Sequence, residues 1–195
     1  MRIQAWAAAA AILGSSALAG EVTPTLKRTV TACMHSGADL LAGHMAQVEV
    51  SKIFAKIEIQ IVWRDPRGCA GDDGTVIISF LNKTPVSDHP DAWAYALPYE
   101  LTHIVVFYDR IQETVGPSGA PHLLAYVVAH EITHILQGVS RHSDTGIMKA
   151  FWNSEDIFEM GRGSLGFAPS DVYILYHNMD KRDALFARIT ATNEK

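Results

Sequence analysis

The order of hydrophobic and polar positions predicts one helix followed by several strands. Between residues 30 and 56 the apolar side chains recur at about helical spacing, which predicts a helix. Residues 57–63 then alternate between apolar and polar, which is typical of a half-buried strand. Further strands are predicted, from short apolar runs bounded by turn residues, at 75–80, 92–96 and 103–108.

A second helix is predicted from Pro121 to Gly138. Proline suits the first position of a helix, and glycine suits the position just past its end. Apolar side chains recur along one side of this segment, at Leu124, Val128, Ile132, Ile135 and Leu136. We therefore expect that side to be buried in the core and the opposite side, which carries two histidines, to face a cleft.

The last helix is predicted to start at Pro169-Ser170-Asp171, after an irregular stretch that runs to about Phe167. A helix, several strands and then two more helices are typical of an α+β domain with a mixed, twisted sheet. The chain has 195 residues, 48% of them hydrophobic, and shows no repeat. It therefore has the size of one domain with a real core.

The first 19 residues have the pattern of a secretory signal peptide. Arg2 supplies a positive start, an apolar stretch runs from Ala5 to Leu13, and Ala17-Leu18-Ala19 forms a small-x-small cleavage site. The apolar stretch is shorter than a membrane span, so we expect no stable membrane insertion. The sequence predicts cleavage before Gly20, which leaves a secreted or periplasmic domain at 20–195.

The run His130-Glu131-Ile132-Thr133-His134 carries the main chemical signal of the chain. On a helix, two histidines four residues apart lie on one face, with Glu131 at the flank. Such a pair binds one zinc ion, and the adjacent carboxylate can act as a general base on a water molecule. The alternative is a chance match between ordinary surface or core histidines.

A catalytic zinc ion usually has three protein ligands and an open position for water. Two residues are candidates for the third ligand. His142 follows His134 by eight residues, and Gly138 between them lets the chain turn back. Glu155 would instead complete the site from a further helix, as in gluzincin-type peptidases.

The residues that follow His142 resemble those of the metzincin metallopeptidases, and among these the matrixin-like ones. In that family a serine follows the third histidine, and a turn with a methionine lies under the ligands. Ser143 and Gly146-Ile147-Met148 match these two features, although His142 arrives two residues later than in the usual metzincin spacing. The resemblance implies a zincin-like, metzincin-type fold and one Zn²⁺ ion, with His130, His134 and His142 as ligands, Glu131 as general base and acid, and Met148 as the Met-turn residue.

Charge and cysteine content indicate the kind of partner and the compartment. Removing Arg2 from the 16 basic residues leaves 15 against 21 acidic ones, a net charge of −6 with no basic cluster, so nucleic acid is not an expected partner. Export to an oxidising compartment favours a disulfide between Cys33 and Cys69, the two cysteines of the chain. Two free thiols are the alternative, and a cysteine ligand to the metal is less favoured because histidines supply the site.

The sequence therefore predicts a secreted zinc-dependent endopeptidase that acts on protein or peptide substrates. In metzincins a strand along the cleft pairs with the extended substrate, and Trp93-Ala94-Tyr95-Ala96 is the corresponding segment here. Three alternatives stay open. They are a gluzincin-type peptidase that uses Glu155, a zinc-binding recognition protein without turnover, and a non-peptide hydrolase with the same metal site.

Overall fold

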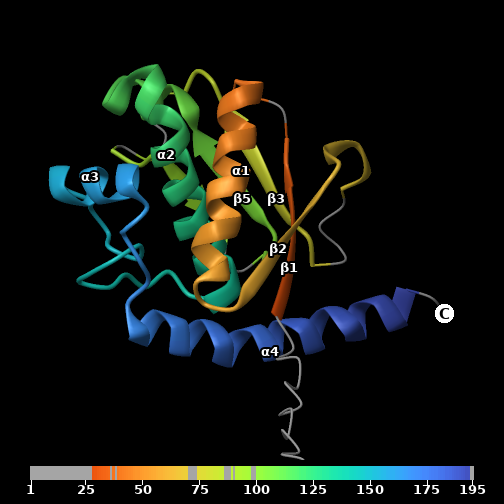
Figure 1. Cartoon of the computed structure of the whole chain (residues 1–195). Coiled ribbons are helices and arrows are strands. Elements are labelled where there is room, and N and C mark those ends of the chain that lie inside the picture. Colours follow the sequence, from red (N-terminus) through yellow and green to blue (C-terminus); the bar gives the residue numbers. More distant parts are fainter. Residues whose placement is uncertain are drawn as a thin grey trace, which may run out of the picture.

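The structure, a computed structural model, describes residues 28–35, 37, 39–69, 74–85, 89, 91–97 and 100–193, of which 190–193 by their backbone alone. The predicted signal peptide lies outside the described residues. The described part has the predicted α+β fold, a five-stranded mixed sheet with helices packed on it (Figure 1). A search of the described helices finds none with the length and apolar character of a membrane span.

The sheet has the strand order β2-β1-β3-β5-β4. Its strands are β1 (Arg28–Met34), β2 (Ile59–Arg64), β3 (Val76–Leu81), β4 (Ala94–Ala96) and β5 (His103–Phe107). All neighbouring strands are parallel except β4, which runs antiparallel to β5 at one edge. In β2 the side chains of Ile59 and Ile61 are buried while that of Gln60 is exposed, which confirms the predicted alternation.

The helix predicted for residues 30–56 is wrong at its start. Residues 28–34 form β1, and α1 (Leu40–Ala55) begins after Asp39, whose side chain accepts hydrogen bonds from two amides of the first turn. Because β1 lies between β2 and β3, both its edges are paired and most of its side chains are covered. The alternation of β1 is short, at Thr29-Val30-Thr31-Ala32, and it was read together with the helical pattern that follows.

Helix α2 (Tyr108–Gln137) is longer than predicted and contains a break. Tyr108, predicted as the end of a strand, and residues 109–115, between that strand and the predicted helix, are helical. Gly116 interrupts the helix with φ 70° and ψ 173°. From residue 120 to residue 137 every side chain except that of His122 is buried. The apolar side is therefore buried as predicted, and the histidine side, which lines a cleft, is also largely covered by neighbouring segments.

Helix α3 (Ser154–Arg162) lies in the stretch that was expected to be irregular. The Asn153 side chain caps its first amides and the Asp156 side chain accepts from the Asn153 amide, so the two form a capping box. Gly163 ends the helix in the left-handed conformation, with φ 68°. The helix has nine residues, of which Asp156 and Met160 are buried.

Helix α4 (Pro169–Asn193) begins where it was predicted and crosses below the sheet in Figure 1. Several polar contacts attach it there. The Asp180 carboxylate pairs with Arg28 of β1 at 2.5 Å, and the Tyr176 hydroxyl donates to the carbonyl oxygen of Ile57. Arg182 donates to the carbonyl oxygen of Gly74, just before β3. The last helix therefore closes one end of the sheet.

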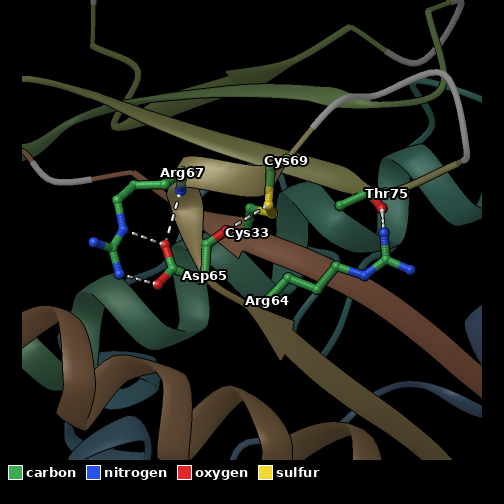
Figure 2. Close-up of a disulfide and its surroundings, with 6 residues drawn as sticks. All are labelled: Cys33, Arg64, Asp65, Arg67, Cys69 and Thr75. Atoms are coloured by element: carbon green, nitrogen blue, oxygen red, sulfur yellow. Dashed lines mark hydrogen bonds and ion pairs between the residues drawn. A yellow bond between two sulfur atoms is a disulfide. The ribbon is translucent and has the colours of Figure 1, made fainter.

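A disulfide joins Cys33 and Cys69, as predicted. Figure 2 shows it between β1 and the short 3₁₀ turn Pro66–Gly68 that follows β2. Asp65 caps this turn by accepting from the Arg67 amide at 2.9 Å and pairs with the Arg67 guanidinium at 2.7 Å. The bridge spans 36 residues of sequence and so fixes the connection after β2 to the centre of the sheet.

Candidate metal centre

Helix α2 presents His130 and His134 one turn apart on its buried second half. Their exposed fractions are 7% and 6%. The helix ends immediately after them at Gly138, which adopts φ 64° and donates its amide hydrogen to the His134 carbonyl oxygen. The chain can therefore leave the helix and turn back toward the histidine face.

Backbone carbonyl groups fix the orientation of both imidazoles. The Nδ1 atom of His130 lies 2.8 Å from the Ile147 carbonyl oxygen, and that of His134 lies 3.0 Å from the Val139 carbonyl oxygen. A carbonyl oxygen only accepts hydrogen bonds, so both Nδ1 atoms carry a hydrogen. Each neutral ring therefore presents a lone pair on its Nε2 atom.

These two Nε2 atoms lie 3.0 Å apart. Two lone pairs at this distance repel unless a positive charge lies between them. A proton is disfavoured there, because burial lowers the pKa of His130 to about 3 and the nearby charge of His134 acts in the same direction. Burial also lowers the pKa of His134. The arrangement therefore fits a metal cation.

His142 adds a third nitrogen from the loop after α2. One potential ligand atom from each of the three histidines lies within 4.8 Å of the others. Zinc–nitrogen bonds of about 2.0–2.1 Å in a tetrahedral site place ligand nitrogens about 3.3 Å apart, so small shifts suffice for all three to bind one ion. No other group of three such side chains within the described ranges is as close.

The structure does not bring Glu155, the other candidate ligand, into this group. Glu155 lies exposed in the first turn of α3. The three-histidine group contains His142 in its place.

The predicted Met-turn contacts His130 through the carbonyl oxygen of Ile147. Met148 is fully buried, and its carbonyl oxygen accepts from the Ser143 amide at 2.7 Å, which closes the loop. Gly146 has φ 74°, and a Cβ atom there would overlap the Gly166 carbonyl oxygen. Ile147, between them, supplies the carbonyl group that orients His130. The turn thus sets the position of a metal-facing ring through the backbone.

Glu131 lines the same cleft as His130 and is 8% exposed. Burial raises its pKa to about 8, against the smaller opposite effect of a hydrogen bond from the Ala96 backbone amide. That amide belongs to the edge strand β4. Glu131 therefore has the altered pKa and the location expected of a proton-transferring group.

Glu131, His130 and His142 line one cleft of about 570 Å³. Its walls come from the segment that enters β4 and from the segment that follows Met148. The residues of these walls are Asp91, Ala92, Trp93 and Ala94 on one side and Lys149, Ala150, Phe151 and Trp152 on the other. Val127 of α2 also contributes.

The four residues predicted to bind substrate divide between two environments. Trp93 and Ala94 line the cleft. Tyr95 instead stacks on His89, with ring centroids 4.4 Å apart, and is not among the lining residues. Ala96 contacts the site through its amide, which bonds to Glu131.

Trp152 is a cleft residue that the sequence did not reveal. Its ring meets the His130 ring edge to face, at 5.5 Å between centroids, and stacks on Trp93 at 5.9 Å. Its only sequence signal is its position four residues after Met148. It brings an aromatic surface next to the three histidines.

Comparisons with known proteins bear on the fold. No protein-family model and no curated protein sequence matches this chain. Among solved structures it is similar to archaemetzincin from Methanopyrus kandleri, with 11% sequence identity and a TM-score of 0.53, over 82% of this chain and 99% of that one. At this identity the similarity concerns the fold alone, and it confirms the zincin-like α+β architecture predicted from the sequence.

Proposed function

We propose that this chain is a zinc-dependent peptidase that hydrolyses protein or peptide substrates. One observation carries the proposal: two buried Nε2 lone pairs face each other at 3.0 Å, a third histidine lies within reach, and an unligated glutamate lines the same cleft. A purely structural zinc site usually fills its fourth position with protein and needs no such glutamate. The archaemetzincin fold supports the same conclusion.

The residues that would hold zinc are His130, His134 and His142. When bound, the ion would lower the pKa of a water molecule and polarise the carbonyl group of a peptide bond. Three neutral imidazoles suit zinc, which favours nitrogen ligands in a tetrahedral arrangement.

Glu131 is the proposed general base and acid. Burial raises the pKa of Glu131, which makes its ionised carboxylate a stronger base toward the attacking water. Water oxygen then bonds to the carbonyl carbon, the carbon–nitrogen bond breaks, and Glu131 returns the proton to the leaving amine. The Ala96 amide, which bonds to Glu131, would hold the carboxylate in place through both transfers.

We propose that an extended peptide lies along β4. This strand is at the end of the strand order and pairs with β5 on one side only among the described strands. Its first residue, Ala94, and the preceding Trp93 line the cleft. An edge strand can bond to an added strand through its outer backbone groups, which is a common mode of peptide recognition. Here the Ala96 amide bonds to Glu131, which leaves the outer groups of Ala94 for a peptide.

We further propose that the protein is exported and works in a secreted or periplasmic location. The signal-peptide pattern of residues 1–19 supports this proposal. The Cys33–Cys69 disulfide also supports it, because such bonds persist in oxidising compartments. Ser143 and the turn ending at Met148 support the matrixin-like assignment within the metzincins.

The test is digestion of a diverse peptide mixture by the zinc-loaded protein, read by mass spectrometry. Controls are a chelated sample, Glu131→Ala, and Glu155→Ala, which removes an exposed glutamate outside the cleft. We expect cleavage by the wild type and by Glu155→Ala and none by the other two. Equal cleavage by Glu131→Ala would refute the proposed role of this residue. Zinc bound at one ion per chain without cleavage would favour a recognition protein without turnover.

A further inference from the structure

The loop that carries His142 has two polar side chains that reach the same carboxylate. Arg141 Nη1 and Ser143 Oγ both donate to Asp171 Oδ1, at 2.7 and 2.5 Å. Arg141 Nη2 also donates to Ser143 Oγ at 3.1 Å. The residues on either side of His142 are therefore hydrogen-bonded to the same carboxylate oxygen.

The carboxylate that binds both residues, that of Asp171, belongs to the start of α4. Asp171 lies in the first turn of this helix and is fully buried, and its amide donates to the Ala168 carbonyl oxygen. Its own carbonyl oxygen accepts from Gln137 Nε2 at 3.1 Å. Gln137 is the last residue of α2, three positions after His134. One residue thus contacts both the helix that carries two histidines and the loop that carries the third.

His142 needs such support more than the other two histidines do. His130 and His134 are held by a buried helix, and carbonyl groups orient their rings. His142 is exposed on a non-helical connection two residues longer than the usual metzincin spacing. A ligand on such a loop loses conformational entropy when it binds, unless the loop is already fixed.

We propose that Asp171 is a positioning residue that fixes His142 for metal binding by holding Arg141 and Ser143. The inference rests on the proposed function, because it takes His142 as a zinc ligand. Groups behind the direct ligands commonly tune metal affinity in this way, and their loss typically costs about 10–100-fold.

Charge supports the same role. The Arg141 guanidinium is next to the proposed third ligand, where its positive charge would disfavour a divalent cation. The Asp171 carboxylate pairs with it at 2.7 Å and has no exposed surface. A buried carboxylate is screened little by solvent, so it offsets the Arg141 charge effectively.

Asp171→Ala tests the proposal, with Asp180→Ala as the matched control. Asp180 is on the same helix and also pairs with an arginine, but its partner is Arg28 of β1, away from the loop. The readouts are zinc affinity by competition with a chelator, the visible spectrum of the Co²⁺-substituted protein, and the unfolding midpoint of the metal-free protein. If Asp171→Ala does not fold, Asp171→Asn keeps the size of the side chain and removes the carboxylate charge.

We expect zinc affinity to fall about 10–100-fold in Asp171→Ala, to fall also in Asp171→Asn, and to stay within about twofold in Asp180→Ala. The Co²⁺ spectrum should weaken, because loss of a histidine ligand shifts the ion from four-coordinate toward higher coordination. A lowered unfolding midpoint of Asp171→Ala with unchanged zinc affinity and Co²⁺ spectrum would overturn the proposal. Asp171 would then stabilise the fold without positioning His142. A wild type that binds no zinc would overturn the proposed function, and this inference with it.

Discussion

The indole ring of Trp93 stacks on that of Trp152, with centroids 5.9 Å apart and an angle of 22° between the planes. The contact joins the two walls of the cleft. Both indole nitrogens are already used, because Trp93 donates to Thr114 Oγ1 at 3.1 Å and Trp152 donates to the Gly146 carbonyl oxygen at 3.4 Å. The pair therefore presents carbon surface to the cleft, beside the ring of His130.

From this arrangement we predict a preference for large apolar side chains next to the cleaved bond. Trp152→Ala should lower kcat/KM for such peptides by about tenfold or more and change little for peptides with charged side chains there. Phe158→Ala, which removes an exposed aromatic ring of α3 outside the cleft, is the control. An equal loss for both classes of peptide would contradict the predicted preference.

The identity of the third ligand gives a second prediction. His142→Ala should leave the dialysed protein with well under one zinc ion per chain, because two histidines alone hold the ion weakly. Glu155→Ala should keep one ion per chain, measured by atomic emission. The reverse pattern would make the site gluzincin-like.

Two glycines give a matched pair for stability. Gly146→Ala should lower the free energy of unfolding by about 2 kcal/mol or more, because φ is 74° there and the added Cβ meets backbone atoms of the segment before α4. Gly161→Ala, in α3 with nothing within 4 Å of the added atom, should raise it by about 0.5–1 kcal/mol. Urea unfolding of both variants measures the difference. Equal effects would show that the turn at Gly146 can relax.

The disulfide should contribute measurably to stability. A loop of 36 residues corresponds to about 4 kcal/mol in the chain-entropy model. We therefore expect the unfolding midpoint in urea to fall when the wild type is reduced, and to fall similarly in Cys33→Ala/Cys69→Ala. A reductant should have no further effect on that variant. If the unfolding midpoint falls far more in the double-cysteine variant than in the reduced wild type, the excess would indicate a packing defect at buried Cys33.

Asp156 gives a prediction about pH. Burial alone would raise its pKa, but hydrogen bonds from Lys149 and from the Asn153 amide, together with the Lys149 charge, outweigh burial and lower it. A carboxyl whose pKa is lowered in the folded state stabilises the fold above its unfolded value, here about 4, and loses that contribution as the pH falls through the lowered pKa. Asp156→Asn should therefore cost about 1 kcal/mol at pH 7, and the difference from the wild type should shrink below about pH 4. A difference that stays constant down to pH 2 would contradict this assignment.

Local patterns were enough to predict four of the five strands and the start of the last helix. The strands at 59–64, 76–81, 94–96 and 103–107 lie within about two residues of their predicted bounds, because turn residues separate them. The start of α4 was visible in Pro169-Ser170-Asp171 for a similar reason. The predicted disulfide followed from the expected compartment rather than from any local pattern, and the structure confirms it.

Long-range relationships could not be predicted. The contacts of Asp171 with Arg141 and Ser143 join residues 30 and 28 positions apart, and no periodic pattern links them. β1 was missed because its short alternation was read together with the apolar positions of α1, and α3 has only nine residues. The side chains that support the proposed ligands could thus not be identified from the sequence, whereas His130 and His134 could be identified from their spacing.

The place of α4 has a consequence for how the centre assembles. Helix α2 alone supplies a two-nitrogen half-site, and the third nitrogen takes its position only when the start of α4 has docked against the loop. An ion that binds the completed site more tightly than the half-site stabilises the docked helix by the same free energy. Bound zinc would therefore stabilise the packing of the C-terminal helix against the rest of the domain, in addition to any role in catalysis.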